Sequence, residues 1–146
     1  MIGLLQRVSR ASVHVGGEPV AAIEVGLLVL VGVQKTDGIT QAERLLERLL
    51  NYRVFPDTQG KMNLSLNDTG GSLLLVPQFT LAADTDSGTR ASFTAAAEPV
   101  LAKTLFEGLV AAAKARHPHV GSGVFGADMQ VSLTNDGPVT FWLEVR

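Results

Sequence analysis

The chain has 146 residues, of which 46% are hydrophobic and 18% are charged. This composition is too apolar for a disordered chain, and the length suits one domain with a real hydrophobic core. The absence of cysteine excludes disulfides, cysteine nucleophiles and cysteine-based metal sites. The formal net charge is −2 and the basic residues are scattered, which argues against a protein that binds a long stretch of DNA or RNA duplex.

The beginning of the chain lacks the pattern of a secretion signal, because Gln6 and Arg7 interrupt its first apolar residues. No apolar run reaches the roughly 18 residues that a membrane-spanning helix requires. We therefore expect a soluble, cytoplasmic protein that does not interact with membranes.

The first third of the chain is predicted to form three β-strands. Residues 2–15 alternate in part between aliphatic and polar side chains and end at a Gly16-Gly17 turn signal. Residues 19–25 form the returning strand. Residues 26–33 are a continuous apolar run, which indicates a strand that is buried on both faces.

A first helix is predicted over residues 40–50. Thr40 and Glu43 have the spacing of a capping box, and leucines recur at helical spacing behind them. The charged residues between the leucines indicate a solvent-facing helix side, to which we assign no function. A second apolar run, residues 72–81, predicts another strand that ends at a proline and several polar residues.

A second helix is predicted to begin at Glu98-Pro99, because proline suits the first turn of a helix. It runs to about Arg116, since Pro118 prevents further extension. Gly108 lies inside this helix, where glycine costs about 1 kcal/mol relative to alanine. We therefore expect a close approach between helix and sheet at Gly108.

The tail is predicted to form two strands, residues 124–133 and 139–145, joined by a turn at residues 134–138. The element order is then β-β-β-α-β-α-β-β, and no linker or repeat divides it. Strands gathered at both ends argue against a doubly wound parallel sheet. The predicted fold class is α+β: a single domain, residues 1–146, with a largely antiparallel, barrel-like sheet packed against two main helices.

Two groups of residues imitate known sites. Residues 121–126 match the G-x-G-x-x-G pattern of dinucleotide-binding folds, but a strand-like segment follows where that motif needs a helix. His14 alternates with valines and is interpreted as solvent-facing, whereas His117 and His119 flank a proline and offer at most an opportunistic metal contact. No Gly-x-Ser-x-Gly motif and no carboxylate cluster at ligand spacing is present, so we predict no metal site and no histidine base.

Two segments place chemistry-bearing residues at the ends of apolar strands. Residues 77–81 bring a proline, an amide and a hydroxyl to the end of one strand, and residues 135–140 bring a Gly-Pro peptide to the beginning of another. Taken alone, each segment is more typical of a turn than of a site, and cis X-Pro bonds make up only about 5–6% of such bonds.

These two segments closely resemble the two signature motifs of the D-aminoacyl-tRNA deacylase (D-tyrosyl-tRNA deacylase) family. The similarity also covers residues 6–8, 60–63 and 125–129, and extends essentially from end to end. One difference stands in the first motif, because the family typically has serine where this chain has Pro77. A proline there supplies neither a hydroxyl nor a backbone N–H.

The resemblance implies a homodimeric hydrolase, without a cofactor, that cleaves the ester between a D-amino acid and the terminal adenosine of tRNA. It implies an active site at the dimer interface and contacts with the acceptor end of tRNA, not with DNA. The residues that match the aminoacyl pocket are Gln78, Phe79 and Thr80, those that match the adenosine site are Phe125, Ala127 and Met129, and those that match the chirality motif are Gly137 and Pro138.

In the family the peptide that matches Gly137-Pro138 is cis and reaches into the partner subunit's pocket. There its backbone occupies the space that an L side chain would need, so the wrong enantiomer is rejected by a clash. Such a wedge would not exclude glycine, which has no side chain, and we therefore expect glycyl-tRNA to be a further substrate.

Two catalytic mechanisms stay open at the level of sequence. Thr80 could attack the ester as a nucleophile, although no base that would activate it is evident. Alternatively, backbone N–H groups near Phe79 and Thr80 form an oxyanion hole, and the ribose 2′-OH of the substrate assists the attack of water. We favour the second mechanism, because the three histidines leave the nucleophile without support.

Two rival functions also stay open. One is an RNA- or ligand-binding domain that kept the shape and lost turnover, an alternative that Pro77 keeps in view. The other is an esterase for small molecules without RNA specificity.

Overall fold

Long antiparallel strands at the beginning of the chain form the frame of the sheet. The computed structural model describes all 146 residues. Its first strands are β1 (Ile2–Val15), β2 (Glu18–Ile23) and β3 (Gly26–Gly32), which confirms the three predicted strands. The length of β1 allows its first half to pair with β3 and its second half with β2. Glycines at positions 16 and 17, with φ of 56° and 80°, form the turn between β1 and β2, since glycine adopts positive φ without strain.

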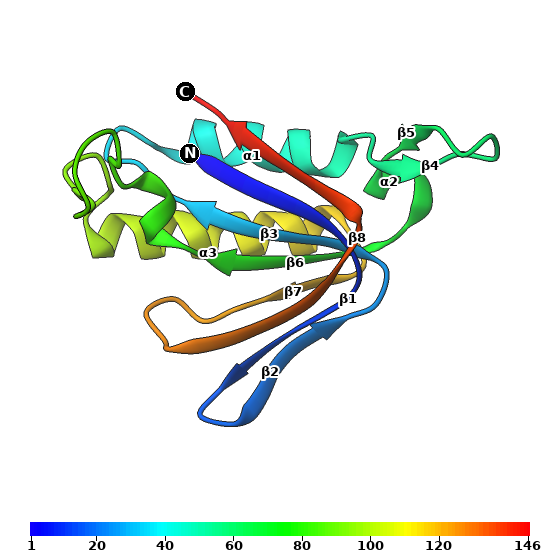
Figure 1. Ribbon diagram of the computed structural model, residues 1–146, viewed down its shortest axis with the longest axis horizontal. Coiled ribbons are helices and arrows are strands. Elements are labelled where there is room, and N and C mark those ends of the chain that lie inside the picture. Colours follow the sequence, from blue (N-terminus) through cyan, green and yellow to red (C-terminus); the bar gives the residue numbers. More distant parts are fainter.

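The other strands complete a mixed sheet. β6 (Ser72–Pro77) runs parallel to β3, and β7 (Val120–Ser122) runs parallel to β6. β8 (Met129–Glu144) pairs antiparallel with nearly the whole of β1. Together the six strands curl into the nearly closed, barrel-like sheet seen in Figure 1. The predicted α+β class with a largely antiparallel sheet is confirmed.

Two long helices and several short elements connect the strands. The long helices are α1 (Ile39–Asn51) and α3 (Pro99–Arg116), and the short elements are β4 (Phe55–Pro56), β5 (Met62–Leu64), α2 (Leu66–Thr69) and the 3₁₀ helix η1 (Phe79–Ala82). The sequence patterns did not reveal these short elements or β7. β4 and β5 form a hairpin that projects from the body of the molecule (Figure 1). None of the helices combines the length and the apolar character needed to cross a bilayer.

The central strands β3 and β6 are buried on both faces, because two hydrophobic cores lie on opposite sides of the sheet. One core packs the leucines of α1 and the apolar face of α3 against β3, β6 and the ends of β1 and β8. The other core fills the curled part of the sheet. β3 contributes Leu27, Val29 and Val31 to the first core and Leu28 to the second, which confirms that this strand is buried on both faces.

The start of α1 differs from the predicted capping box. The helix begins at Ile39, so Thr40 lies inside its first turn. The residue that precedes the helix is Gly38, and Gln41 accepts a hydrogen bond from the Gly38 N–H through its side-chain oxygen at 2.9 Å. Gln41 thus takes the role predicted for Glu43, because the helix starts earlier than the Thr40 pattern indicated.

The prediction that Gly108 marks a close helix–sheet contact was wrong. Gly108 is exposed on α3, and a Cβ atom added there would meet no atom within 4 Å. The close approaches lie elsewhere, for example at Gly26, where an added Cβ would be 1.9 Å from the Ser72 carbonyl oxygen.

The tail forms one strand instead of the two predicted. The expected turn at residues 134–138 lies within β8, and the expected strand start at Val124 is a loop up to Met129. β8 stays paired because β1 is long enough to accompany it on both sides of the predicted turn. The register matches Asn135 with Val8 and Thr140 with Gln6, so four residues of β8 bulge out opposite Arg7.

Candidate active site

A cavity of about 490 Å³ opens where β6, η1, the start of α3 and the loop before β8 meet. Eight of its thirteen lining residues are hydrophobic. The structure brings five of the predicted site residues together in its wall: Gln78, Phe79, Phe125, Ala127 and Met129. Residues from the end of one apolar strand and from a loop some fifty positions later thus form one apolar pocket, the shape in which small groups are usually bound.

Thr80 follows Phe79 on η1 but is not among the residues that line the cavity. Its hydroxyl oxygen accepts a hydrogen bond from the side-chain amide of Gln78 at 2.5 Å. This amide is the one side-chain partner of the hydroxyl, and an amide N–H is a donor that cannot remove a proton. The geometry therefore fixes the position of Thr80 without activating it as a nucleophile.

The backbone at the same place offers hydrogen-bond donors. Phe79 and Thr80 are the first two residues of η1, and the first N–H groups of a helix have no partner within it. Gln78 N–H is engaged, because it donates to the Val31 carbonyl at 2.8 Å. The N–H groups of Phe79 and Thr80 are therefore the candidate donors of this segment, and Phe79 itself lines the cavity.

Pro77 is accommodated at the end of β6 without the loss of a ladder bond. Since Gln78 N–H points to β3, the nitrogen of Pro77 points to the other side, toward β7. β7 ends at Ser122, which pairs with Leu75, so no strand stands opposite the proline nitrogen. Proline is confined to such unpaired positions in sheets.

The second motif is a bulge of β8 that side chains hold in place. Arg7 donates to the Asp136 carbonyl at 3.0 Å and to the Val54 carbonyl at 2.7 Å. Asn135 accepts a hydrogen bond from Val139 N–H at 3.0 Å. The Asn135–Val139 bond thus joins the two ends of the bulge, and Arg7 holds it against β1.

The tip of this bulge is Gly137-Pro138. The peptide bond between the two residues is cis, and both are exposed. Neither residue lines the cavity of the same chain. Within one protomer the structure therefore joins the first motif with residues 125–129 but leaves the second motif apart, on the surface.

Comparison with known proteins identifies the family of the chain. The model of the D-Tyr-tRNA(Tyr) deacylase family matches residues 4–144. The chain belongs to this family.

Relatives and solved structures extend the agreement to nearly full length. A D-aminoacyl-tRNA deacylase of Thioalkalivibrio sulfidiphilus is 66% identical over 99% of this chain and 97% of its own, and one of Pseudomonas putida is 63% identical over 99% and 100%. A structure described as c-Myc DNA Unwinding Element Binding Protein superimposes with a TM-score of 0.95 at 37% identity, covering 100% of this chain and 99% of that one. A probable eukaryotic D-amino acid tRNA deacylase shares the fold, with a TM-score of 0.83 at 17% identity, covering 99% of this chain and 98% of that one.

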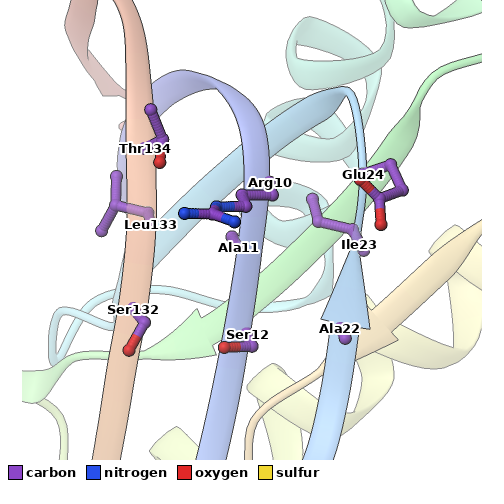
Figure 2. A pocket seen from close by; sticks show the side chains of 9 residues that line it. All are labelled: Arg10, Ala11, Ser12, Ala22, Ile23, Glu24, Ser132, Leu133 and Thr134. Atoms are coloured by element: carbon purple, nitrogen blue, oxygen red, sulfur yellow. The ribbon is translucent and has the colours of Figure 1, made fainter.

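A second hollow of about 370 Å³ lies on β1, β2 and β8 (Figure 2), and its lining residue Thr134 directly precedes the second motif. Arg10 and Glu24 bring opposite charges to it, and Ser12, Ser132 and Thr134 bring hydroxyls. Figure 2 shows the Arg10 side chain extended from β1 toward β8. None of the predicted site residues lines this hollow.

The G-x-G-x-x-G match and the histidines do not form a nucleotide or metal site. Gly121 and Ser122 belong to β7, and the chain passes from there through a loop into β8, so no helix begins inside the G-x-G-x-x-G match. His117 is buried, and its Nε2 lies 2.6 Å from the Gly71 carbonyl oxygen. His14 is half-buried rather than fully solvent-facing, and His119 is exposed.

The sequence did not point to several residues at the cavity. Pro99 and Ala102 line it from the start of α3, and Ala97 lines it from just before the helix. Phe93 packs on Phe79 with ring centroids 5.3 Å apart. For these residues the sequence offered one signal, the predicted helix start at Glu98-Pro99, which places the helix but not the cavity. Phe93 directly follows the polar stretch without periodicity, residues 84–92, so no sequence pattern placed it.

Proposed function

We propose that this protein hydrolyses the ester between a D-amino acid and the 3′-terminal adenosine of tRNA, releasing D-amino acid and free tRNA. The observation that carries the proposal is the single apolar cavity shared by Gln78 and Phe79 with residues 125–129. These are the segments that match the aminoacyl pocket and the adenosine site, and a substrate that joins the two groups by an ester would place its bond between them. Charged tRNA is a cytoplasmic substrate, so we place the protein in the cytoplasm.

For the chemical step we propose that backbone donors, not a nucleophilic hydroxyl, stabilise the reaction. The N–H groups of Phe79 and Thr80 would bind the oxyanion while water, assisted by the ribose 2′-OH, attacks the carbonyl carbon and the bond to the ribose oxygen breaks. Each well-placed donor of this kind contributes about 2.7–4 kcal/mol. The absence of any base at the Thr80 hydroxyl supports this mechanism over direct attack.

Thr80→Ala separates the two mechanisms. We expect a loss of kcat of less than about tenfold, because the substitution leaves the backbone donors in place. A substrate with a 2′-deoxy terminal adenosine should react far more slowly with both proteins. A loss of about 10⁴-fold or more in the Thr80→Ala variant, approaching the roughly 10⁶-fold loss of known nucleophile replacements, would establish the nucleophile instead.

For chirality we propose that Gly137-Pro138 of one subunit enters the cavity of another in a homodimer. The exposed tip of the bulge and its fastening by Arg7 and Asn135 support a rigid wedge. The wedge predicts cleavage of D-alanyl- and glycyl-tRNA, but not of L-alanyl-tRNA. Cleavage of the L form at a comparable rate would contradict it, as would a protein that stays at the 15.4 kDa of one chain in sedimentation equilibrium.

One assay also decides between the rival functions. The protein is incubated with D-alanyl-tRNA and, separately, with a D-alanyl ester that carries no RNA. Hydrolysis restricted to the tRNA ester supports the proposal, and hydrolysis of both indicates a small-molecule esterase. Binding without hydrolysis indicates a nucleic-acid-binding protein without turnover, an alternative of interest because a similar structure is described as a DNA-binding protein.

A further inference from the structure

Two exposed phenylalanine rings stand at the rim of the candidate active site. Phe79 is 58% exposed and Phe93 is 46% exposed, although large apolar side chains are mostly buried in this fold. Their rings pack on each other at a centroid distance of 5.3 Å and an interplanar angle of 45°. Phe79 also lines the cavity, so the pair continues the apolar wall of the site outward to the surface.

Backbone hydrogen bonds hold Phe93 in this place although its segment has no regular structure. Ser92 and Asp84 exchange two backbone hydrogen bonds, of 2.7 and 2.9 Å. On the other side of Phe93, Lys35 N–H donates to the Ala95 carbonyl and Ala97 N–H donates to the Val33 carbonyl, both at 3.0 Å. The ring is therefore presented by a segment that is fastened on both sides, and little ordering remains to be done on binding.

Two unpaired basic residues belong to the chain around Phe93: Arg90 lies on the same segment, and the backbone of Lys35 is hydrogen-bonded to that segment at Ala95. Lys35 and Arg90 are exposed, and none of the five ion pairs of the structure includes them. The loop also carries Asp84 and Asp86, so charge alone selects no partner. The rings favour a nucleic-acid strand, because proteins that bind single strands combine basic residues with aromatic side chains on which the bases stack.

We propose that Phe79 and Phe93 form a stacking platform for the nucleotide that precedes the terminal adenosine of the substrate. This inference rests on the proposed function and adds to it a subsite outside the cavity. The terminal adenosine and its aminoacyl group occupy the cavity, and the next base along the single strand reaches the rim, where it stacks on the exposed ring of Phe93. Lys35 and Arg90 face the phosphates of the same strand.

The test compares two substrates that differ only beyond the terminal adenosine: D-alanyl-tRNA and 2′(3′)-O-D-alanyl-adenosine. Phe93→Leu keeps an apolar side chain and removes the aromatic face. Because one stacked base is worth about 5- to 150-fold in affinity, we expect Phe93→Leu to raise KM for D-alanyl-tRNA by about that factor. KM for D-alanyl-adenosine and kcat for both substrates should stay within about twofold, and Phe93→Tyr should restore the KM for tRNA.

Phe141→Leu is the matched control, because Phe141 is also an exposed ring paired with another aromatic, Tyr52, at 5.6 Å. It should alter neither KM. An equal effect of Phe93→Leu on both substrates, or no effect on either, overturns the platform. A Phe93→Leu variant that dissociates in sedimentation equilibrium also overturns it and assigns the rings to a subunit contact.

The stacking platform can be tested even if the proposed deacylase activity is absent. If the wild-type protein hydrolyses neither substrate, the deacylase proposal fails. The platform is then decided by the binding of an uncharged RNA trinucleotide that ends in adenosine, compared with adenosine alone. The Phe93→Leu substitution must weaken binding of the trinucleotide and leave binding of adenosine unchanged. Equal affinity of wild type and Phe93→Leu for the trinucleotide overturns the platform.

Discussion

The amino group of Met1 is buried, and the carboxylate of Asp37 is its one counter-charge. Met1 N lies 2.7 Å from Asp37 Oδ1, and it also donates to the Val145 carbonyl at 2.7 Å and to Gln34 Oε1 at 3.1 Å. The other oxygen of Asp37 accepts Gln34 N–H at 2.7 Å. Both carboxylate oxygens therefore receive donors, in a place where the Asp37 side chain is only 2% exposed.

Asp37→Asn should accordingly destabilise the protein by about 3–5 kcal/mol, because it leaves a buried ammonium without its counter-charge and turns an N–H toward another donor. The measurement is urea unfolding of both proteins. Glu107→Gln provides the control, since the Lys103–Glu107 pair at 3.7 Å is exposed and should cost only about 0.3–0.5 kcal/mol. Equal stability of Asp37→Asn and wild type would show that the ion pair adds nothing.

The two glycines discussed above make opposite predictions for the elements that contain them. Gly108 is exposed and meets nothing, so Gly108→Ala should stabilise α3 by about 0.5–1 kcal/mol. Gly26 begins β3 against the Ser72 carbonyl, so Gly26→Ala must displace β3 from β6 and should destabilise the protein. Thermal and urea unfolding of both variants measure the two effects. A destabilised Gly108→Ala variant would mean that α3 has a contact at this position.

An ionised carboxylate, that of Asp57, stabilises the turn of the β4–β5 hairpin. Asp57 accepts backbone hydrogen bonds from Lys61 and Gln59 and a side-chain hydrogen bond from Asn63, and the Lys61 bond is the main cause that lowers the pKa of Asp57 below 3.8. A lowered pKa means that folding favours the carboxylate, so its contribution is complete above the ordinary value and is lost as the pH falls through the lowered one.

We therefore expect the amide protons of Gln59 and Lys61 to exchange faster as the pH is lowered through the folded-state pKa of Asp57, once intrinsic exchange rates are taken into account. Hydrogen exchange followed by NMR measures this. In Asp57→Asn the same amides should be weakly protected at every pH, with no acid transition. An acid transition that persists in Asp57→Asn would assign the effect to another group.

Local patterns predicted elements where local interactions decide them. The leucines of α1 and the apolar run of β3 face the cores that their periodicity indicated. The tail was misjudged because its turn residues are typical of a turn, whereas the pairing is decided by β1, more than a hundred positions earlier. At the site, the motif residues were identified by resemblance, but Phe93 was not, because its place depends on backbone bonds to Lys35 and Asp84.

At the scale of the whole molecule, charge limits how much of an RNA the protein can bind. The net charge is −2, and the platform offers two basic side chains, Lys35 and Arg90. Each phosphate of a single strand that is neutralised contributes about −0.7 to the slope of log K against log salt concentration, so two contacts predict a slope of about −1.4. A protein that grips a duplex through six or more phosphates has a slope of about −5 or steeper.

The affinity for uncharged tRNA should be measured between 50 and 200 mM salt, the range over which such slopes are usually compared. We expect the shallow slope for the wild type and a slope near zero for the double variant Lys35→Gln, Arg90→Gln. A Lys103→Gln, Lys114→Gln protein controls for net charge, because it loses the same two charges from α3 and should keep the wild-type slope. A steep slope in all three proteins would mean that RNA contacts an extended surface, and the acceptor end would then not be the main binding determinant.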